Sequence, residues 1–513
     1  MSEPRIHSGG TSQSLETLRI RAARLASALN ADGIGPGDRV AVVMRNDIAF
    51  VEVTLAVGLV GAAPVPINWH WTGDDLAHAL ADSRSRLAVV HTDLLPAVES
   101  SAPGLPIIEA EIPPGVRCAY GLAEQPSTGR WPTLSQRIDT HEPRTEPSPA
   151  APMSVIYTSG TTGRAKGVLR DPVAVADRPT LLANIAKLWH LAPAETTLIP
   201  APLYHSAPNV HATFAVALGM NLHIMPRFDA EEFLRLVQEH RVNSVQMVPT
   251  MFNRLLQLPE QVRRSYDLSS LKAIVHAAAP CPRHVKEAMI GWLGPIVHEY
   301  YGGAEVGAFT ACDTAEALSR PGTVGRPILD ADVRILGEDG TDKPVGEDGI
   351  VYGRCFTGWP DFTYIDDEPK RRRMERDGYL TLGDIGHLDD EGYLYLSDRL
   401  NDMVVSGGVN IYPAEVEACL LDLEGVADVA VFGIPDPDLG EVLAAHIQPI
   451  PGAILHPAEI RTYVGSRLAR YKVPREVVLA DELPREDTGK LFKRRLKQQY
   501  LEAAGHNGDE GVA

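Results

Sequence analysis

Two patterns of apolar residues alternate along most of the chain. Residues 14–29, 48–62 and 72–83 carry apolar side chains at helical spacing, whereas 39–44 and 87–90 are short apolar runs. Apolar residues that recur with a period of about 3.6 predict amphipathic helices, and short apolar runs between them predict buried strands. This repeated order of strand and helix predicts parallel sheets covered by helices, which is the α/β class.

The alternation resumes in the middle of the chain after an interruption. Residues 122–152 are rich in Pro, Ser and Thr and poor in periodicity, so we expect a surface connection there. Asp229 and Glu232 have the spacing of a capping box for a helix over 230–240. Strands are predicted afterwards, at 244–248 and 272–278, and a further helix and strand follow them.

The last third of the sequence changes character twice. From about residue 320 to 400 the pattern is strand-like and broken by turn sequences such as GEDG, RDG and DDEG, which predicts a small β-barrel-like part. The final stretch of roughly 110 residues alternates helix and strand again and predicts a separate small α+β unit. A chain of 513 residues is long enough for several sub-cores.

Composition and charge limit the kinds of molecule that the protein is expected to bind. The formal net charge of −19 argues against nucleic acid or an anionic membrane as the main partner. Cations nevertheless gather between residues 461 and 497, either to meet an anionic small molecule or as an ordinary solvated face. The start of the sequence lacks the pattern of a secretory signal, and the apolar runs are too short to span a bilayer. The five cysteines are scattered and suggest no disulfide framework. A reducing cytoplasm is therefore the expected location.

The segment YTSGTTGRAKG, residues 157–167, is typical of a phosphate-binding loop. Glycine lets backbone amides approach phosphate oxygens, hydroxyl groups donate further hydrogen bonds, and Lys166 adds a mobile positive charge. The sequence is not a Walker A loop, since no Lys-Ser or Lys-Thr pair follows the glycines. The other candidate ligands in this loop are Thr158, Ser159, Gly160, Thr161, Thr162 and Gly163.

The loop resembles the signature of the adenylate-forming superfamily, which includes acyl-CoA synthetases, adenylation domains of peptide synthetases and luciferases. Further matches follow in the family's order: PLYHSAP, YGGAE, LGDIGHLDDEGYLYLSDR, SGGVNIYPAEVE and DTGKL. The chain is most similar to a bacterial fatty-acid-type acyl-CoA ligase. The resemblance implies a large N-terminal domain over 1–398, a hinge at 399–402 and a small mobile C-terminal domain over 403–513.

The resemblance also implies a two-step reaction with ATP, Mg²⁺ and coenzyme A. A carboxylate attacks the α-phosphate of ATP to give an acyl-adenylate and pyrophosphate, and a thiol then displaces AMP. Lys490, in DTGKL, matches the lysine that holds the carboxylate and the α-phosphate together. Glu305 matches the magnesium-binding glutamate, and one carboxylate with ATP oxygens and waters suits that ion. Thr158 and His205 complete the expected catalytic set.

Other motif residues match nucleotide and coenzyme contacts. Tyr301 corresponds to the ring that stacks on adenine, and Asp384 to the carboxylate that accepts both ribose hydroxyls. His205 and the segment 247–252 are expected to form walls of the acyl pocket. The remaining matches are Ala278 and Ala279 at the adenine wall, Gly302, Gly303 and Ala304 beside Tyr301, Arg399 near ribose or phosphate, and Gly407 and Gly408 along the pantetheine path.

Three positions depart from the family pattern. Ala304 replaces a Thr or Ser whose hydroxyl contacts phosphate, so we expect weakened but retained activity, because one neutral hydrogen bond contributes roughly 0.5–1.5 kcal/mol. The hinge position is Asn401 where the family commonly has Asp or Lys. Leu382 occupies a position where Thr is frequent.

We therefore predict an ATP-dependent ligase that joins CoA to an apolar carboxylic acid, whether fatty, alicyclic or aromatic. PLYHSAPNVHATF lacks the Asp that pairs with an amino-acid ammonium group. One alternative is loading of the acid onto a carrier protein, and another is a nucleotide-binding protein that has lost catalysis, as Ala304 would allow. Assembly as a homodimer is left open.

Overall fold

A nine-stranded sheet forms the centre of the N-terminal part. The computed structural model describes all residues except 1–2, 147, 150–151, 159–164, 401, 407–408, 438, 486–490, 492 and 510–513. The sheet runs in the order β15-β14-β13-β12-β11-β9-β10-β1-β2 and is parallel from β1 to β13. Its strands are β1 (Arg5–Ser8), β2 (Thr11–Ser14), β9 (Thr196–Ile199), β10 (Asn221–Ile224), β11 (Ser244–Met247), β12 (Ala273–His276), β13 (Val297–Gly303), β14 (Gly307–Cys312) and β15 (Arg326–Pro327).

A second sheet, wholly parallel, lies beside it in the order β4-β3-β5-β6. Its strands are β3 (Arg39–Val43), β4 (Ala63–Pro66), β5 (Leu87–His91) and β6 (Ile107–Ala110). The helices of this half are α1 (Leu15–Ala31), α2 (Ile48–Leu59), α3 (Gly73–Ser83), α4 (Leu95–Ser101), α5 (Pro114–Tyr120), α6 (Leu134–Asp139), α7 (Arg178–Leu188) and α8 (Ser206–Leu218), with the short 3₁₀ turn η1 (Thr92–Leu94).

The two sheets and their helices form alternating layers. One core cluster joins α1, α2, α7 and α8 to strands of both sheets, so these helices lie between them. A second cluster packs α3 and α4 on the far face of the smaller sheet. A third packs α9 (Ala230–His240), α10 (Pro249–Leu256) and α12 (Arg283–Leu293) on the far face of the larger sheet. The layering confirms the helix-covered parallel sheets expected from the alternation.

Antiparallel strands form the β-rich part that the turn-rich stretch predicts. A five-stranded sheet has the order β16-β17-β20-β19, with β21 also paired to β20, and a three-stranded sheet has the order β18-β8-β7. The strands are β7 (Ile156–Thr158), β8 (Lys166–Arg170), β16 (Asp332–Leu336), β17 (Gly349–Arg354), β18 (Phe362–Tyr364), β19 (Glu375–Arg376), β20 (Tyr379–Leu388) and β21 (Leu394–Arg399). The helices α13 (Thr314–Ser319) and α14 (Glu368–Arg373) lie nearby, whereas α11 (Glu260–Arg264) follows α10 and contacts α12.

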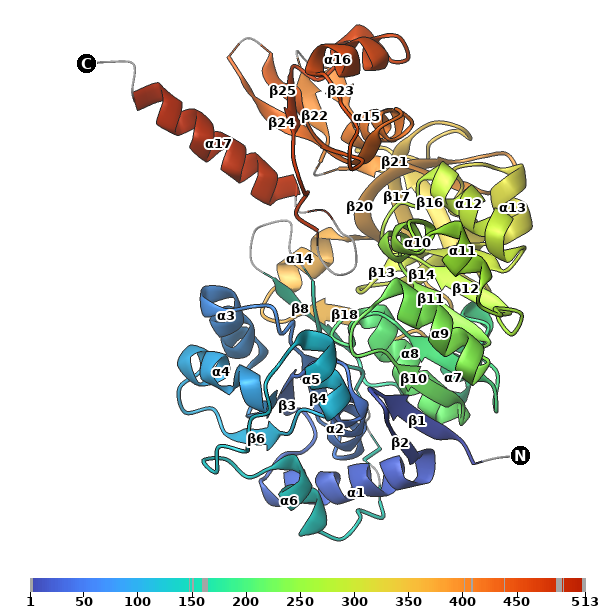
Figure 1. Ribbon diagram of the computed structural model, residues 1–513. Helices are drawn as coiled ribbons and strands as arrows, with labels where there is room; N and C mark the ends of the chain where they lie inside the picture. Colours follow the sequence, from blue (N-terminus) through green and yellow to red (C-terminus); the bar gives the residue numbers. More distant parts are fainter. Residues whose placement is uncertain are drawn as a thin grey trace.

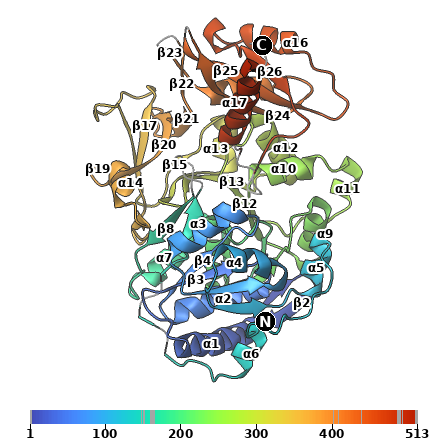
Figure 2. The ribbon, with the colours of Figure 1, turned by 90° about the vertical axis from the view of Figure 1, so that its left-hand side faces the viewer.

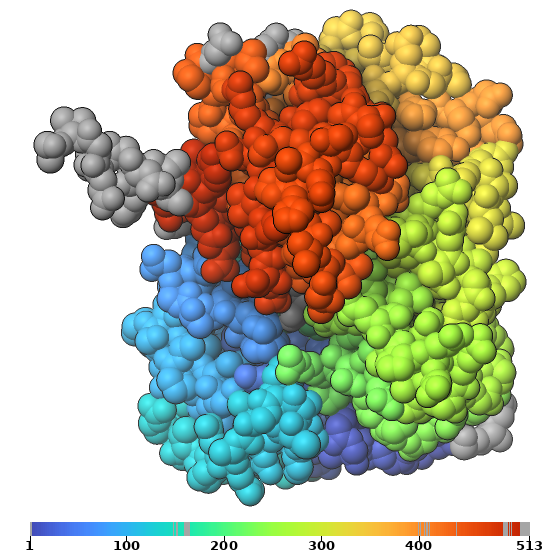
Figure 3. All heavy atoms as spheres, turned by 45° about the horizontal axis from the view of Figure 1, so that its top comes forward, coloured from blue at the N-terminus to red at the C-terminus, as the bar shows by residue number. Residues whose placement is uncertain are grey.

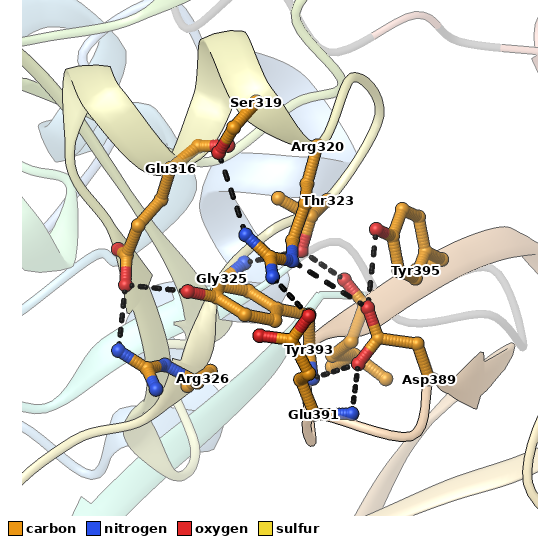
Figure 4. Close-up of polar contacts among 11 residues, drawn as sticks. Glu316, Ser319, Arg320, Thr323, Gly325, Arg326, Asp389, Glu391, Tyr393 and Tyr395 are labelled. Carbon is orange, nitrogen blue, oxygen red and sulfur yellow. Dashed lines mark hydrogen bonds and ion pairs between the residues drawn. The ribbon is translucent and has the colours of Figure 1, made fainter.

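Polar contacts fasten the β20–β21 turn to α13. The Arg320 guanidinium lies over the ring of Tyr393, 4.2 Å from its centroid, and forms an ion pair with Glu391 (Figure 4). The Tyr393 hydroxyl donates to Glu316 at 3.0 Å, and Arg326 pairs with the same carboxylate at 2.9 Å. This cluster holds the hairpin against the large sheet and so limits where the rest of β20 can lie.

The last part of the chain is a compact α+β unit. Its sheet has the order β23-β22-β25-β24 with β26 beside β25, and Figures 1 and 2 show these elements together at the top of the molecule. In Figure 3 the orange and red C-terminal residues lie over the blue and green N-terminal part. The elements are β22 (Val404–Ser406), β23 (Val409–Ile411), α15 (Pro413–Leu421), β24 (Val426–Asp436), β25 (Gly440–Pro449), α16 (Pro457–Gly465), η2 (Arg470–Lys472), β26 (Glu476–Leu479) and α17 (Lys493–Asp509).

Local expectations fail at a few points. The predicted surface connection over 122–152 contains the helix α6, which begins with a capping box at Thr133 and packs Leu134 and Ile138 into the core. At the start of α9, the Asp229 side chain accepts from the Glu232 amide, but the reciprocal half of the box does not form. The β1–β2 hairpin was not predicted, because its strands are only four residues long.

All five cysteines are free thiols. Cys118, on α5, is exposed, whereas burial raises the pKa of Cys281, Cys312 and Cys355 to about 12. In the described part of the chain, no helix combines the length and the apolar character needed to cross a bilayer.

Buried histidines make stability depend on pH. Burial lowers the pKa of His211 to about 3 and of His276 to about 4, from an ordinary value of 6.5. The folded protein therefore resists protonation at these rings, while the unfolded chain takes up protons below pH 6.5. Stability should be highest above that pH and should fall as the pH drops toward the folded pKa values.

We predict that lowering the pH from 7 to 5 costs about 2 kcal/mol of unfolding free energy through His211 alone. Urea unfolding at several pH values measures this loss. His211→Gln should flatten the pH dependence, because it removes a buried ring whose pKa differs between the folded and unfolded chain. An equal slope in wild type and His211→Gln would contradict the assignment.

Candidate functional site

One cavity collects most of the described residues that the sequence motifs single out. It has a volume of about 2480 Å³ and is lined by parts of both the N-terminal sheets and the C-terminal unit. Five of the predicted residues among its lining are Thr158, His205, Tyr301, Ala304 and Asp384. These residues are far apart in sequence, and they meet because the carboxyl ends of β7, β12 and β13 open toward the same space.

Glu305 follows the end of β13 and is held by two hydroxyl donors. Thr158, the last residue of β7, donates to Glu305 Oε1 at 3.1 Å, and the Tyr364 hydroxyl donates to the same oxygen at 3.1 Å. Burial and the Glu305 charge raise the pKa of Tyr364, so its hydroxyl stays protonated and remains a donor. The carboxylate is therefore fixed in position beside the phosphate loop.

Tyr301 and Asp384 form a direct hydrogen bond. The Tyr301 hydroxyl donates to Asp384 Oδ2 at 2.6 Å, and both residues are buried. Asp384 lies in β20 and is the cross-strand partner of Arg399 in β21, whose backbone is described but whose side chain is not. The antiparallel register thus brings the two residues predicted to meet ribose next to each other.

The wall opposite Tyr301 has an unusual backbone. Ala278 has φ of +76°, in the left-handed region that residues with a side chain seldom adopt. Such strain is found mainly where a binding site requires it. Ala278 is exposed and Ala279 half-buried, and both line the cavity, while their role at the adenine wall stays a prediction.

The glycines of YGGAE permit a close approach of strands. A Cβ on Gly302 would lie 1.9 Å from the Gly307 carbonyl oxygen across the β13–β14 bulge. A Cβ on Gly303 would lie 3.0 Å from the Leu382 side chain. Leu382, where the family frequently has Thr, therefore packs directly against the motif.

Apolar and aromatic side chains line another region of the cavity. His205 immediately precedes α8, and its ring lies 4.3 Å from that of Tyr204. Trp189, Tyr300 and Trp359 lie in the same lining. The predicted wall over 247–252 is only partly correct: residues 248–250 line the cavity, whereas the side chains of Met247, Met251 and Phe252 are buried in the core behind it.

Cations near the phosphate loop are held by residues that sequence motifs did not identify. Lys166 Nζ lies 3.3 Å from Asp367. Lys370 Nζ lies 4.0 Å from the centroid of the Tyr364 ring, and burial lowers the Lys370 pKa. Tyr364 and Lys370 belong to β18 and α14, and no spacing in the sequence connects those elements to residues 157–167.

Five cations of the stretch 461–497 form ion pairs within the C-terminal unit. Ion pairs join Lys472 to Glu415, Arg475 to Asp436, Arg485 to Asp428, Lys493 to Glu417 and Lys497 to Glu441. Arg467 stacks on the Tyr463 ring instead. Several of these cations also line the cavity, so contact with coenzyme phosphates stays a prediction.

Several predicted residues lie outside the described residues. These are Ser159, Gly160, Thr161, Thr162, Gly163, Asn401, Gly407, Gly408 and Lys490. The ends of the phosphate loop are described, and β7 and β8 pair with each other through Thr158 and Lys166.

Comparison with known proteins gives consistent matches along the chain. Residues 2–355 match the AMP-binding enzyme family, and residues 415–490 match the AMP-binding enzyme C-terminal domain. A long-chain-fatty-acid–CoA ligase, FadD13 of Mycobacterium tuberculosis, is 32% identical over 487 residues, covering 93% of this chain and 91% of the relative. A feruloyl-CoA synthase of Amycolatopsis sp is 33% identical over 503 residues, covering 96% and 95%.

A solved structure shows the same fold. The o-succinylbenzoate CoA synthetase of Bacillus subtilis, in complex with its acyl-adenylate intermediate, is 25% identical with a TM-score of 0.81, covering 96% of this chain and 95% of that one. The sequence motifs, the family matches and the fold agree. The chain is a member of the AMP-binding enzyme family, within the adenylate-forming superfamily, and carries both of the family's domains.

Proposed function

We propose that this protein activates an apolar carboxylic acid as an acyl-adenylate with ATP and Mg²⁺ and then transfers the acyl group to coenzyme A. It is an AMP-forming acid–thiol ligase, as its acyl-CoA ligase relatives are. The observation that carries the proposal is the meeting of Thr158, Tyr301 and Asp384 in one cavity that is also lined by aromatic side chains. Glu305 adjoins this cavity through its hydrogen bond with Thr158.

The described residues would have different roles in the first step of the reaction. The carboxylate of the acid attacks the α-phosphorus of ATP, and pyrophosphate leaves. The acyl carbon then carries AMP, which is a much better leaving group than hydroxide. Tyr301 and Asp384 would hold the nucleoside, and Lys166 and Lys370 would face the phosphates. Negative charge grows on the phosphate oxygens in the transition state, and fixed cations and hydroxyl donors stabilise it.

Glu305 would supply the protein ligand for Mg²⁺. In the described part of the chain, no group of three or more His, Cys, Asp or Glu could hold a metal ion. Mg²⁺ commonly binds one carboxylate together with substrate phosphates and water, and Glu305 fits because the hydroxyl groups of Thr158 and Tyr364 hold its side chain in position. The bound ion would neutralise phosphate charge.

The chemistry of the acid follows from the lining. Trp189, Tyr300 and Trp359 offer large apolar surfaces, and burial raises the pKa of Tyr300, so its hydroxyl remains neutral. A fatty, alicyclic or aromatic acid fits these walls. We also propose that the division at 399–402 acts as the hinge of the two steps. A cytoplasmic location and a homodimer stay predictions from the sequence.

A panel of acids tests the proposed reaction. With ATP, Mg²⁺ and CoA, fatty or ring-bearing acids should give both pyrophosphate and a thioester. Lys490→Ala should lower the rate of acyl-adenylate formation by roughly 100-fold or more, because a fixed charge at the reacting centre is lost. An undiminished rate in this variant would remove the proposed role. Pyrophosphate without thioester would support adenylation alone, and ATP binding without turnover would support a binding protein.

Asp384→Asn tests the ribose contact. Loss of charge-assisted hydrogen bonds of about 1.5–3 kcal/mol should raise the KM for ATP roughly 10- to 100-fold. Tyr301→Phe serves as the matched control, since it removes the 2.6 Å hydrogen bond to Asp384 but keeps the ring. Steady-state kinetics with varied ATP measures both. A KM that moves equally in the two variants would show that the Tyr301 contact, and not ribose binding, sets the value.

Glu305→Gln tests the metal contact. The neutral amide should increase the Mg²⁺ concentration needed for half-maximal pyrophosphate release by roughly 10-fold or more, because a charged ligand is lost. Glu347→Gln, at an exposed position in the same β-rich part, is the control and should titrate like the wild type. Identical Mg²⁺ titrations of Glu305→Gln and wild type would refute the assignment.

A further inference from the structure

Arg170 is a buried cation next to the phosphate loop. It is the last residue of β8, the strand that follows the loop, and its exposed fraction is 2%. Arginine is almost never fully buried unless it is paired. The family motif ends at Gly167, so the sequence pattern drew no attention to this residue.

The contacts of Arg170 are with neutral groups. Its Nη2 donates to the Ala304 carbonyl and lies 3.5 Å from Ser206 Oγ, and its Nη1 lies 3.4 Å from the Ser154 carbonyl. The guanidinium also lies 5.4 Å from the centroid of the Trp359 ring. Its Nε is buried and has no hydrogen-bond partner among the described residues.

No carboxylate in the described part of the chain lies within ion-pair distance of this guanidinium. Glu305 is the acidic group whose charge acts on it, and this attraction opposes the effect of burial, which lowers the Arg170 pKa to about 10. The side chain is therefore a cation at neutral pH. A buried charge without an ion pair is destabilising, and an apolar residue of similar size commonly stabilises such a position.

The groups around Arg170 belong to the segments that form the reaction centre. Ala304 is the motif position that lacks the family's phosphate-binding hydroxyl, and Ser206 follows His205 directly. Both residues line the cavity. The positive charge thus lies behind the wall against which the acid and the phosphates would meet, and the charge of Glu305, the proposed magnesium ligand, acts on it.

We propose that Arg170 is an electrostatic and positioning residue for adenylation, which holds the Ala304 carbonyl and supplies a fixed positive charge that partly replaces the missing hydroxyl. This inference rests on the proposed function. Since the guanidinium acts through the protein wall and does not touch the reacting atoms, its effect falls on the rate of acyl-adenylate formation. The uncompensated charge lowers the stability of the free enzyme and is offset by the negative charge that grows on the phosphate oxygens in the transition state.

Three variants of the full chain test this role. Arg170→Met removes the charge and keeps much of the volume, Arg170→Lys keeps the charge without the forked donors, and Arg235→Met makes the same change on the surface of α9. For each, pyrophosphate release is measured at saturating acid with varied ATP, and the melting temperature is measured with and without ATP and Mg²⁺.

We expect kcat of Arg170→Met to fall roughly 10- to 100-fold, with the KM for ATP changed by less than about 3-fold. The melting temperature of free Arg170→Met should equal or exceed that of the wild type. Arg170→Lys should recover part of kcat, and Arg235→Met should behave as wild type. An unchanged kcat in Arg170→Met would overturn the proposal. So would a lost kcat together with a lower melting temperature and no recovery by lysine, because that outcome means a purely structural role.

Different results would refute the proposed function and the proposed role of Arg170. Wild-type protein that releases no pyrophosphate with any acid would refute the proposed function. The rise in melting temperature caused by ATP and Mg²⁺ should be similar in Arg170→Met and wild type, because the KM for ATP changes little, and a much smaller rise in Arg170→Met would show a binding role instead. An active wild type whose kcat is unchanged in Arg170→Met would overturn the role of Arg170 alone, and the proposed function would stand.

Discussion

The hydrogen bonds that converge on Glu305 join parts of the molecule that share no local sequence. Thr158 comes from β7, Tyr364 from β18, and Glu305 itself follows β13 of the large parallel sheet. The three-stranded sheet β18-β8-β7 therefore docks the phosphate loop onto the β13 end through one carboxylate. Removal of that carboxylate would leave the Thr158 hydroxyl without its acceptor and the Tyr364 hydroxyl with only the weak acceptor Met374 Sδ, which is costly inside a protein. The geometry of the cavity depends on this junction.

Much of the architecture could be predicted from the sequence because the signals are local. The helix predicted over 14–29 and the strand predicted over 39–44 appear as α1 and β3. Such elements can be predicted because the spacing of apolar residues shows which face of a helix or strand is buried. The motif residues Tyr301 and Asp384 were predicted as parts of one nucleotide site, and the structure joins them by a hydrogen bond. That inference came from the family resemblance, because nothing in the spacing of 83 residues indicates contact.

Other features could not be predicted, since they arise from contacts between distant segments. Tyr364 reaches Glu305, and Lys370 lies over the Tyr364 ring, because β18 pairs with β8 in antiparallel register. The cationic excess of residues 461–497 is partly neutralised in the folded protein, because acids from α15, β24 and β25 form ion pairs with five of these cations. The helix α6 was missed for the opposite reason: six residues are too few to show a period. Local patterns record burial, whereas charge pairing depends on the folded arrangement.

The uneven burial of the cysteines has a practical consequence. Cys281, Cys312 and Cys355 stay as thiols at neutral pH because the surrounding protein disfavours the thiolate, which is the reactive form. Cys118 projects from α5 on the surface of the N-terminal half. A maleimide dye would therefore attach preferentially at that helix, so the native protein already offers a fluorescence reporter site on the half opposite the C-terminal unit.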